Sequence, residues 1–183
     1  MSPKDRSIEL TLISASNLKK VRALGQQKSY IVAYIYTDHK FTSNVDNEGG
    51  LNPTWNFHLK LDCEEALFAH HGSYLNVEIY SRGHSSNSSS DTLIGTVSIP
   101  LRDLDKDVRC HVEAEPMSFQ VRRPSGTVKG VLNVAIKLGA LHDKRSEGRL
   151  SSHAPEFSCK RVDQAVDGEN LKHGHIKKMG AIE

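Results

Sequence analysis

The sequence predicts an all-β protein: an eight-stranded antiparallel β-sandwich with a disordered C-terminal tail. The first sign is alternation. In 54-TWNFHLKLD-62 and 131-VLNVAIKL-138, apolar side chains alternate with polar ones, which is typical of strands with one buried face and one wet face. The second sign is spacing, because such segments are separated by short connections rich in turn residues, such as 47-NEGGLNP-53 and 124-PSG-126. Regularly spaced short strands of this kind indicate a sandwich.

Each element is expected in turn along the chain. The first two strands, 7-SIELTLISA-15 and 29-SYIVAYIY-36, are dominated by β-branched, aromatic and other apolar residues, and the turn 37-TDH-39 leads into a shorter strand, 40-KFTSNV-45. The alternating strand 54–62 follows the Gly/Asn/Pro turn, and 63-CEEALFAHH-71 has room for one or two helical turns. The remaining strands are expected at 74–80, 93–101, 117–123 and 131–138.

The amino-acid composition of the chain changes near residue 141. Residues 1–140 are expected to form the folded domain, and 141–183 a mostly disordered tail, because the tail has mixed charge, few large apolar residues and a single aromatic residue, Phe157. The segment 160–173 is the one part of this tail for which a transient helix is expected.

Bulk composition excludes several classes of protein. The 183 residues carry a formal net charge of only +2, so overall charge does not indicate a nucleic-acid partner. No stretch is apolar for long enough to span a membrane, and MSPKDRSIEL lacks a signal region. The three isolated cysteines, Cys63, Cys110 and Cys159, suit a reducing cytosol. Because no motif of a hydrolase, a P-loop enzyme or a zinc protease is present, we expect a non-catalytic protein without cofactor or metal.

Three stretches in this order resemble the C2 domain. The run 16-SNLKKVRALGQQKSYIVAYI-35 is similar to the first loop of that family, 49-GGLNPTWN-56 resembles its NPxWN signature, and 90-SDTLIGTVSIPL-101 resembles its DDxIGxxxIPL segment. The closing stretch, 117–139, is similar to the small plant C2 proteins described as cold-regulated, a group that includes the BONZAI-associated proteins. The resemblance covers residues 5–140 and implies a C2 sandwich of type II topology.

The resemblance also implies a calcium site that this chain has lost. The acidic ligands of the family would fall at Lys20 and Lys28 in the first loop, and at Ser81, Gly83 and Thr92 in the third. None of these is acidic, and Asp91 would serve only if the alignment shifted by one residue. Because Ca²⁺ affinity depends on the number of charged oxygen ligands, we expect no useful calcium binding.

Basic residues stand where the acids are missing, and a C2 fold would bring them to one tip. The candidate lipid- or anion-binding residues are Lys19, Lys20, Arg22, Lys28, Arg82 and His84. Three interpretations stay open for them: contact with anionic lipid, a merely solvated loop, or contact with an acidic protein. Candidate phosphorylation sites are Ser88, Ser89 and Ser90 in the serine-rich loop, and Ser125 and Ser152, which follow basic residues. Phosphate in the loop would oppose its positive charge.

These observations predict a calcium-independent C2 module that docks on anionic phospholipid. The resemblance implies roles in stress, defence and cell-death control through a membrane-associated signalling partner, with the protein in the cytoplasm, peripheral to the inner face of the plasma membrane. The alternative is a soluble protein-interaction adaptor whose membrane location, if any, comes from its partner.

Overall fold

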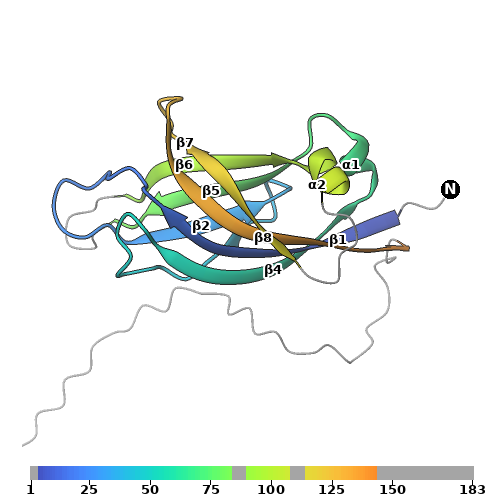
Figure 1. Cartoon of the computed structure of the whole chain (residues 1–183), viewed down its shortest axis with the longest axis horizontal. Helices are drawn as coiled ribbons and strands as arrows, with labels where there is room; N and C mark the ends of the chain where they lie inside the picture. The colour runs from blue at the N-terminus through green and yellow to red at the C-terminus, as the bar shows by residue number, and fades with distance from the viewer. Residues whose placement is uncertain (1–3, 84–89, 108–113, 144–183) are drawn as a thin grey trace, which may run out of the picture. The chain divides into compact units, whose positions relative to one another are not determined.

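Strands dominate the structure, a computed structural model that describes residues 4–83, 90–107 and 114–143. Within these residues lie eight strands and two short helices (Figure 1). The strands are β1 (Lys4–Ser16), β2 (Ser29–Tyr34), β3 (Phe41–Thr42), β4 (Thr54–Glu64), β5 (Tyr74–Ser81), β6 (Thr92–Pro100), β7 (Glu115–Arg122) and β8 (Val128–Asp143), and the helices are α1 (Ala66–Ala69) and α2 (Leu101–Asp107). The expected end of the domain at residue 140 is too early, because β8 continues to Asp143, where it pairs with Lys4 of β1. The rest of the expected tail (144–183), its transient helix, Cys110 and Cys159 lie outside the described residues.

The strands follow the order β3-β2-β5-β6-β7-β8-β1-β4, and neighbouring strands are antiparallel. Between β6 and β7 the only register pair among the described residues is Thr96 with Arg122, so the sheet folds there into two layers. Gly95 permits the close approach, because a Cβ at that position would lie 2.5 Å from Val121 Cγ1 and 2.8 Å from the Arg122 carbonyl oxygen. The last strand lies between β7 and β1, which is the expected type II order.

The core lies between the two layers, as in other β-sandwiches. Its side chains come from alternate positions of the strands, and those that are almost completely inaccessible include Ile8, Leu10 and Leu12 of β1, Val77 and Ile79 of β5, and Leu132 and Val134 of β8. The alternation in the sequence therefore predicted the buried face of these strands, and the all-β sandwich is confirmed.

Strand β8 is longer than expected, Val128–Asp143 in place of 131–138, and two further regions differ in kind. The expected strand 40–45 is reduced to two residues, because the Ser43 hydroxyl accepts the hydrogen bond of Ile31 N–H at 3.0 Å and so replaces a backbone carbonyl in the ladder. The chain turns into α2 at Leu101, a residue that the sequence pattern places at the end of a strand. Leu101 and Leu104 are one helical turn apart and both buried, so they anchor this helix to the core. Neither helix in the described part of the chain is long and apolar enough to cross a membrane.

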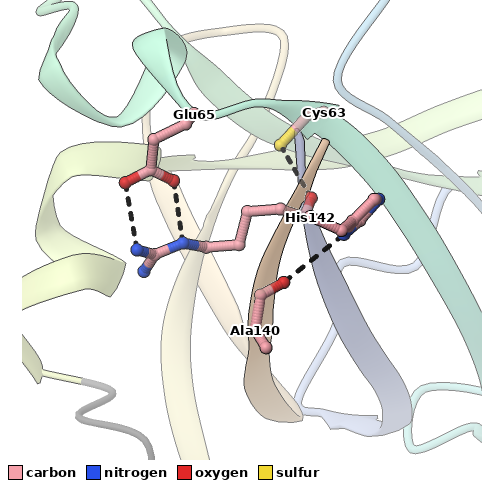
Figure 2. A network of polar contacts seen from close by, with 5 residues as sticks. Cys63, Glu65, Ala140 and His142 are labelled. Carbon is pink, nitrogen blue, oxygen red and sulfur yellow. Dashed lines mark hydrogen bonds and ion pairs between the residues drawn. The ribbon is translucent and has the colours of Figure 1, made fainter. Parts of the chain in front are cut away.

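The start of β1 is fixed by an ion pair (Figure 2). The Arg6 guanidinium donates from Nη2 to Glu65 Oε1 at 3.0 Å, while Nε lies 2.8 Å from Oε2. The same guanidinium lies over the Phe68 ring, 5.3 Å from its centroid. Cys63 is buried beside it, with Sγ 3.8 Å from the Arg6 carbonyl oxygen. These contacts hold β1, the end of β4 and α1 together.

Candidate functional site

Three loops meet at the end of the sandwich where β1 and β5 finish. We call them the first loop (17–28), the second loop (43–53) and the third loop (82–91), and the described part of the third loop is 82–83 and 90–91. Leu18 N–H donates to the Leu51 carbonyl at 3.0 Å, which joins the first and second loops. Arg82 N–H donates to the Lys28 carbonyl at 2.8 Å, which joins the third loop to the first. The sequence predicts this convergence of the first and third loops.

The Arg22 side chain also connects the first loop to the end of β5, immediately before the third loop. Its Nε donates to Ser81 Oγ at 3.2 Å, and its Nη2 donates to the Ser81 carbonyl at 3.3 Å. Ser81 is completely buried. A planar guanidinium with several donors is suited to such a two-point contact, so one of the predicted basic residues also has a structural role.

The first loop is shaped by Gln27, which sequence reasoning did not select. This side chain is only 2% exposed. Its Oε1 accepts from Val21 N–H at 2.9 Å, and its Nε2 donates to the Lys19 carbonyl at 3.3 Å. Satisfied buried amides of this kind rigidify a loop, and here the loop projects an apolar residue. Leu24 is 86% exposed at a point where most of its neighbours are exposed too. In the sequence, the sign of this exposed side chain is a leucine within a loop that is rich in basic residues.

Both oxygens of the Asp91 carboxylate already accept hydrogen bonds within the protein. Its Oδ1 accepts from Gly83 N–H at 2.6 Å, and its Oδ2 accepts from the Tyr30 hydroxyl at 2.7 Å. The Gly83 hydrogen bond, followed by that of Tyr30, lowers the pKa of this carboxyl, and the charges of Arg82 and Arg22 lower it further against the effect of burial. The carboxylate therefore closes the base of the third loop.

Asp46 has the same kind of role in the second loop. Its Oδ1 accepts from the backbone N–H groups of Glu48 and Gly49 at 2.8 and 2.7 Å, and its Oδ2 accepts from Thr54 N–H at 2.6 Å. Burial alone would raise the pKa of Asp46, but these hydrogen bonds outweigh it and the pKa is lowered. Throughout the described ranges, no three His, Cys, Asp or Glu side chains gather in a way that could hold a metal ion.

The remaining predicted residues occupy different environments. Lys19, Lys20, Lys28 and Arg82 are exposed, Arg22 is half-buried, Gly83 is half-buried, and Thr92 is exposed and pairs with Ser81 at the start of β6. Two candidate phosphorylation sites, Ser90 and Ser125, are exposed. His84, Ser88, Ser89 and Ser152 lie outside the described residues.

A second polar cluster lies on the outer face of β2 and β5. The Glu78 carboxylate accepts from the hydroxyls of Tyr34 and Tyr80 at 2.8 and 2.9 Å. Lys40 Nζ lies 4.0 Å from the same carboxylate and 4.4 Å from the centroid of the Tyr34 ring. Burial, followed by the Glu78 hydrogen bond, raises the pKa of Tyr34 to about 12. Tyr80 also stacks on Tyr30, with ring centroids 5.5 Å apart. The charged groups of this face neutralise one another.

Several known proteins are similar to this chain in sequence or in fold. The family model for the C2 domain matches residues 6–114. The chain is 33% identical to Protein SRC2 homolog of Arabidopsis thaliana over 92% of its own length, but it spans only 52% of that relative. It is 30% identical to BON1-associated protein 2 of Arabidopsis thaliana, covering 88% of this chain and 73% of the relative.

A third relative is named as a lipid-binding protein. The Calcium-dependent lipid-binding protein of Arabidopsis thaliana is 26% identical over the whole of this chain and 32% of its own length. Among solved structures, a C2 domain of plant Extended Synaptotagmin 1 superposes with a TM-score of 0.57 at 15% identity, over 73% of this chain and 93% of that one, which supports the fold alone. The family match and the two closer relatives agree with the loop signatures and the strand order. The chain therefore belongs to the C2 domain family, within the group of plant C2 proteins that includes the SRC2 and BON1-associated proteins.

Proposed function

We propose that this C2 domain docks on anionic membranes without calcium, through basic side chains of the first and third loops. The observation that carries the proposal is the first loop itself. It holds the exposed Lys19, Lys20 and Lys28, together with an 86% exposed Leu24. Moreover, no acidic residue occurs between Glu9 and Asp38. A positive loop with a projecting apolar side chain has the chemistry that an anionic lipid interface selects.

The expected strength of docking follows from general magnitudes. Each basic side chain close to an anionic leaflet contributes about 1 kcal/mol, and complete burial of a leucine side chain contributes roughly 1.5–3 kcal/mol. The expected result is reversible adsorption. It comes from a partly inserted Leu24 and four exposed basic residues, Lys19, Lys20, Lys28 and Arg82. Because much of this attraction is electrostatic, it weakens as salt rises.

Calcium independence is proposed from the chemistry of the loops. Lysines take the two first-loop positions where the family resemblance places acids. The one acid of the third loop, Asp91, already accepts two hydrogen bonds. The relative named as a calcium-dependent lipid-binding protein differs from this proposal in its ion requirement. The proposal therefore predicts that lipid binding survives in this chain when calcium is removed.

Co-sedimentation with vesicles tests the proposal directly. The full chain is mixed with phosphatidylserine-containing vesicles or with pure phosphatidylcholine vesicles, in EGTA and in calcium, at low and at physiological salt. We expect binding to the anionic vesicles alone, equal in EGTA and calcium, and weaker at higher salt. Absence of binding at low salt would refute lipid docking, whereas binding that needs calcium would refute the proposed ion independence.

The third loop offers a place for regulation. Ser90 is exposed and precedes Asp91, and phosphate on Ser88, Ser89 or Ser90 would add nearly two negative charges beside the basic loops. We expect Asp substitutions at these three serines to weaken vesicle binding, with Asn substitutions as neutral controls. Unchanged binding of the Asp variant would contradict this mode of regulation.

Recruitment of a signalling partner is the second part of the proposal. A relative is named for its association with BON1, which supports a protein partner for this chain in stress, defence or cell-death control at the inner face of the plasma membrane. The alternative is an adaptor that reaches membranes only through that partner. The two are separated by the location in cells of the Lys19→Gln, Lys20→Gln, Lys28→Gln variant. Its matched control neutralises Lys4, Lys60 and Lys137, which lie on strands. Loss from the membrane in the loop variant alone supports direct docking, and retention supports the adaptor.

A further inference from the structure

A basic hairpin joins β7 to β8 beside the first loop. We call residues 122–129 the β7–β8 hairpin. Its turn is closed by two backbone hydrogen bonds of 2.8 Å, from Arg123 N–H to the Thr127 carbonyl and from Gly126 N–H to the Arg123 carbonyl. Figure 1 shows it, in yellow and orange, projecting out of the sandwich. Arg122 and Lys129 are exposed, and so is Val128, at 45%.

The base of the hairpin lies next to the start of the first loop. At its base, Val131 of β8 pairs with Ser16, the last residue of β1. Gly130 has a positive φ of 97°, and a Cβ there would lie 3.0 Å from Leu18 Cδ2 and 3.0 Å from the Ser16 carbonyl oxygen. Only glycine readily adopts this backbone at such a close approach. The two projections therefore share one packed base.

Charge is distributed asymmetrically around this end of the domain. On the β8 side of β1, the sequence contains no acidic residue between Glu115 and Asp143. On the β4 side lies the second loop, which carries Asp46 and the exposed Glu48. The first loop stands between them. Positive charge therefore extends from the first loop toward the hairpin and not toward the second loop.

The arginines of the hairpin are held in place by its turn. Arg122 Nη1 donates to the Gly126 carbonyl at 3.0 Å, and Arg123 Nη1 donates to Thr127 Oγ1 at 3.3 Å. Each guanidinium keeps further donors for an anionic group, because it has five N–H bonds. Ordering these long side chains in advance reduces the entropy lost when they bind.

We infer that the β7–β8 hairpin is a second contact with the anionic lipid surface. The domain then docks tilted, with the first loop and the hairpin toward the headgroups and the second loop turned away. This inference rests on the proposed lipid docking and adds to it the orientation of the domain. The lipid phosphates and carboxylates would meet Arg122, Arg123 and Lys129, while the exposed Val128 would lie at the headgroup level.

Neutralising the hairpin tests the contact. The variant Arg122→Gln, Arg123→Gln, Lys129→Gln is compared with the control Lys4→Gln, Lys60→Gln, Lys137→Gln, which removes the same charge from strands. With phosphatidylserine vesicles in EGTA, we expect the Kd of the hairpin variant to rise about tenfold or more, because each basic contact contributes about 1 kcal/mol, or a factor of about five. The control should stay within about twofold of wild type on the same scale.

The outcomes separate this inference from the docking proposal. If wild type does not bind, both fail. If wild type binds and the hairpin variant binds equally well, the hairpin contact is overturned and the docking proposal stands. Circular dichroism and thermal unfolding of each variant establish that a loss of binding is not a loss of folding.

Fluorescent labels test the orientation without removing charge from the hairpin. In a Cys110→Ser, Cys159→Ser background, an environment-sensitive probe is attached at Ser125→Cys or at Glu48→Cys. Cys63 should stay unlabelled, because it is 2% exposed and burial raises the pKa of its thiol to about 12. We expect vesicles to shift the emission at 125 and leave that at 48 unchanged. A silent probe at 125, or equal shifts at both positions, would overturn the tilted orientation.

Discussion

The Arg22 guanidinium contacts both oxygen atoms of Ser81, donating to Oγ at 3.2 Å and to the carbonyl oxygen at 3.3 Å. Ser81 is one of the positions where the family resemblance expects a calcium-ligating acid. The serine instead accepts from an arginine of the opposite loop. A cationic side chain of the first loop is thus attached to the end of β5, at a position where the family resemblance implies a calcium ligand.

Replacing Arg22 with lysine separates its charge from its geometry. Lysine keeps the positive charge but lacks the planar fork that reaches both oxygens of Ser81. We expect Arg22→Lys to lower the free energy of unfolding by about 1 kcal/mol and to weaken vesicle binding, as measured by urea unfolding and co-sedimentation. Lys20→Arg, a change of equal size and unchanged charge at an exposed position, is the control. Equal behaviour of the two variants would mean that the link to Ser81 has no energetic role.

Asp91 gives the third loop a dependence on acid pH. The hydrogen bond from Gly83 N–H, and then that from Tyr30, lowers the pKa of Asp91. Because the folded-state pKa lies below the unfolded one, the stabilisation is present above the unfolded pKa, roughly 3.9, and is lost as the pH falls through the folded value. We expect Asp91→Asn to reduce this loss at pH values below the unfolded pKa, with thermal unfolding followed as the pH is lowered from neutral. An unchanged pH profile would contradict the assignment.

The same substitution has a signature at high pH. Burial, followed by the Asp91 hydrogen bond and charge, raises the pKa of Tyr30. In Asp91→Asn, the titration of Tyr30, resolved from the other tyrosines by NMR, should move part of the way back toward the ordinary tyrosine value, roughly 10. Tyr34, whose hydroxyl donates to Glu78, serves as an internal control that should keep its pKa of about 12. A Tyr30 titration identical to wild type would show that its link to Asp91 is not formed in solution.

Much of the fold was readable because strand periodicity is local. Alternation in 131–138 placed Leu132, Val134 and Ile136 on the buried face, and the structure confirms this. The length of β3 was not readable, because it is decided by the Ser43 hydroxyl, which bonds to Ile31 twelve residues away. Leu101 was placed at the end of a strand because its apolar character fits strand and helix equally well, and the helical spacing to Leu104 settled the matter in the structure.

At the candidate site, sequence reasoning identified charges but not contacts. The convergence of Lys28 and Arg82 follows from the family order of loops, and a backbone hydrogen bond joins the two residues. In contrast, a buried Gln27 that holds the first loop cannot be told from its exposed neighbour Gln26 by composition alone. The approach of the β7–β8 hairpin to the first loop depends on β8 pairing with β1, which is a long-range contact.

Leu24 provides an apolar test of docking that leaves charge unchanged. Its side chain is 86% exposed, so its removal should cost the folded protein little. If the side chain enters the interface, Leu24→Ala should weaken binding to phosphatidylserine vesicles roughly five- to tenfold, part of the 1.5–3 kcal/mol for a fully buried leucine. Leu51→Ala, in the second loop and 36% exposed, should have little effect on binding. Equal losses of vesicle binding in both variants would contradict the tilted orientation. If neither variant loses binding, docking depends on charge alone.

Gly95 tests the junction between the two layers of the sandwich. An added Cβ would lie 2.5 Å from Val121 Cγ1 and 2.8 Å from the Arg122 carbonyl oxygen, and the carbonyl cannot move without disturbing the pairing of Arg122 with Thr96. We expect Gly95→Ala to lower the free energy of unfolding by about 1–3 kcal/mol, as for other overpacked sites, measured by urea unfolding with Trp55 fluorescence. Gly72→Ala is the matched control, because its Cβ would meet only the movable His70 ring at 3.2 Å. Since Arg122 also begins the β7–β8 hairpin, the same variant should weaken vesicle binding if the hairpin is a contact. Wild-type stability of Gly95→Ala would mean that β6 and β7 do not approach as closely as the fold requires.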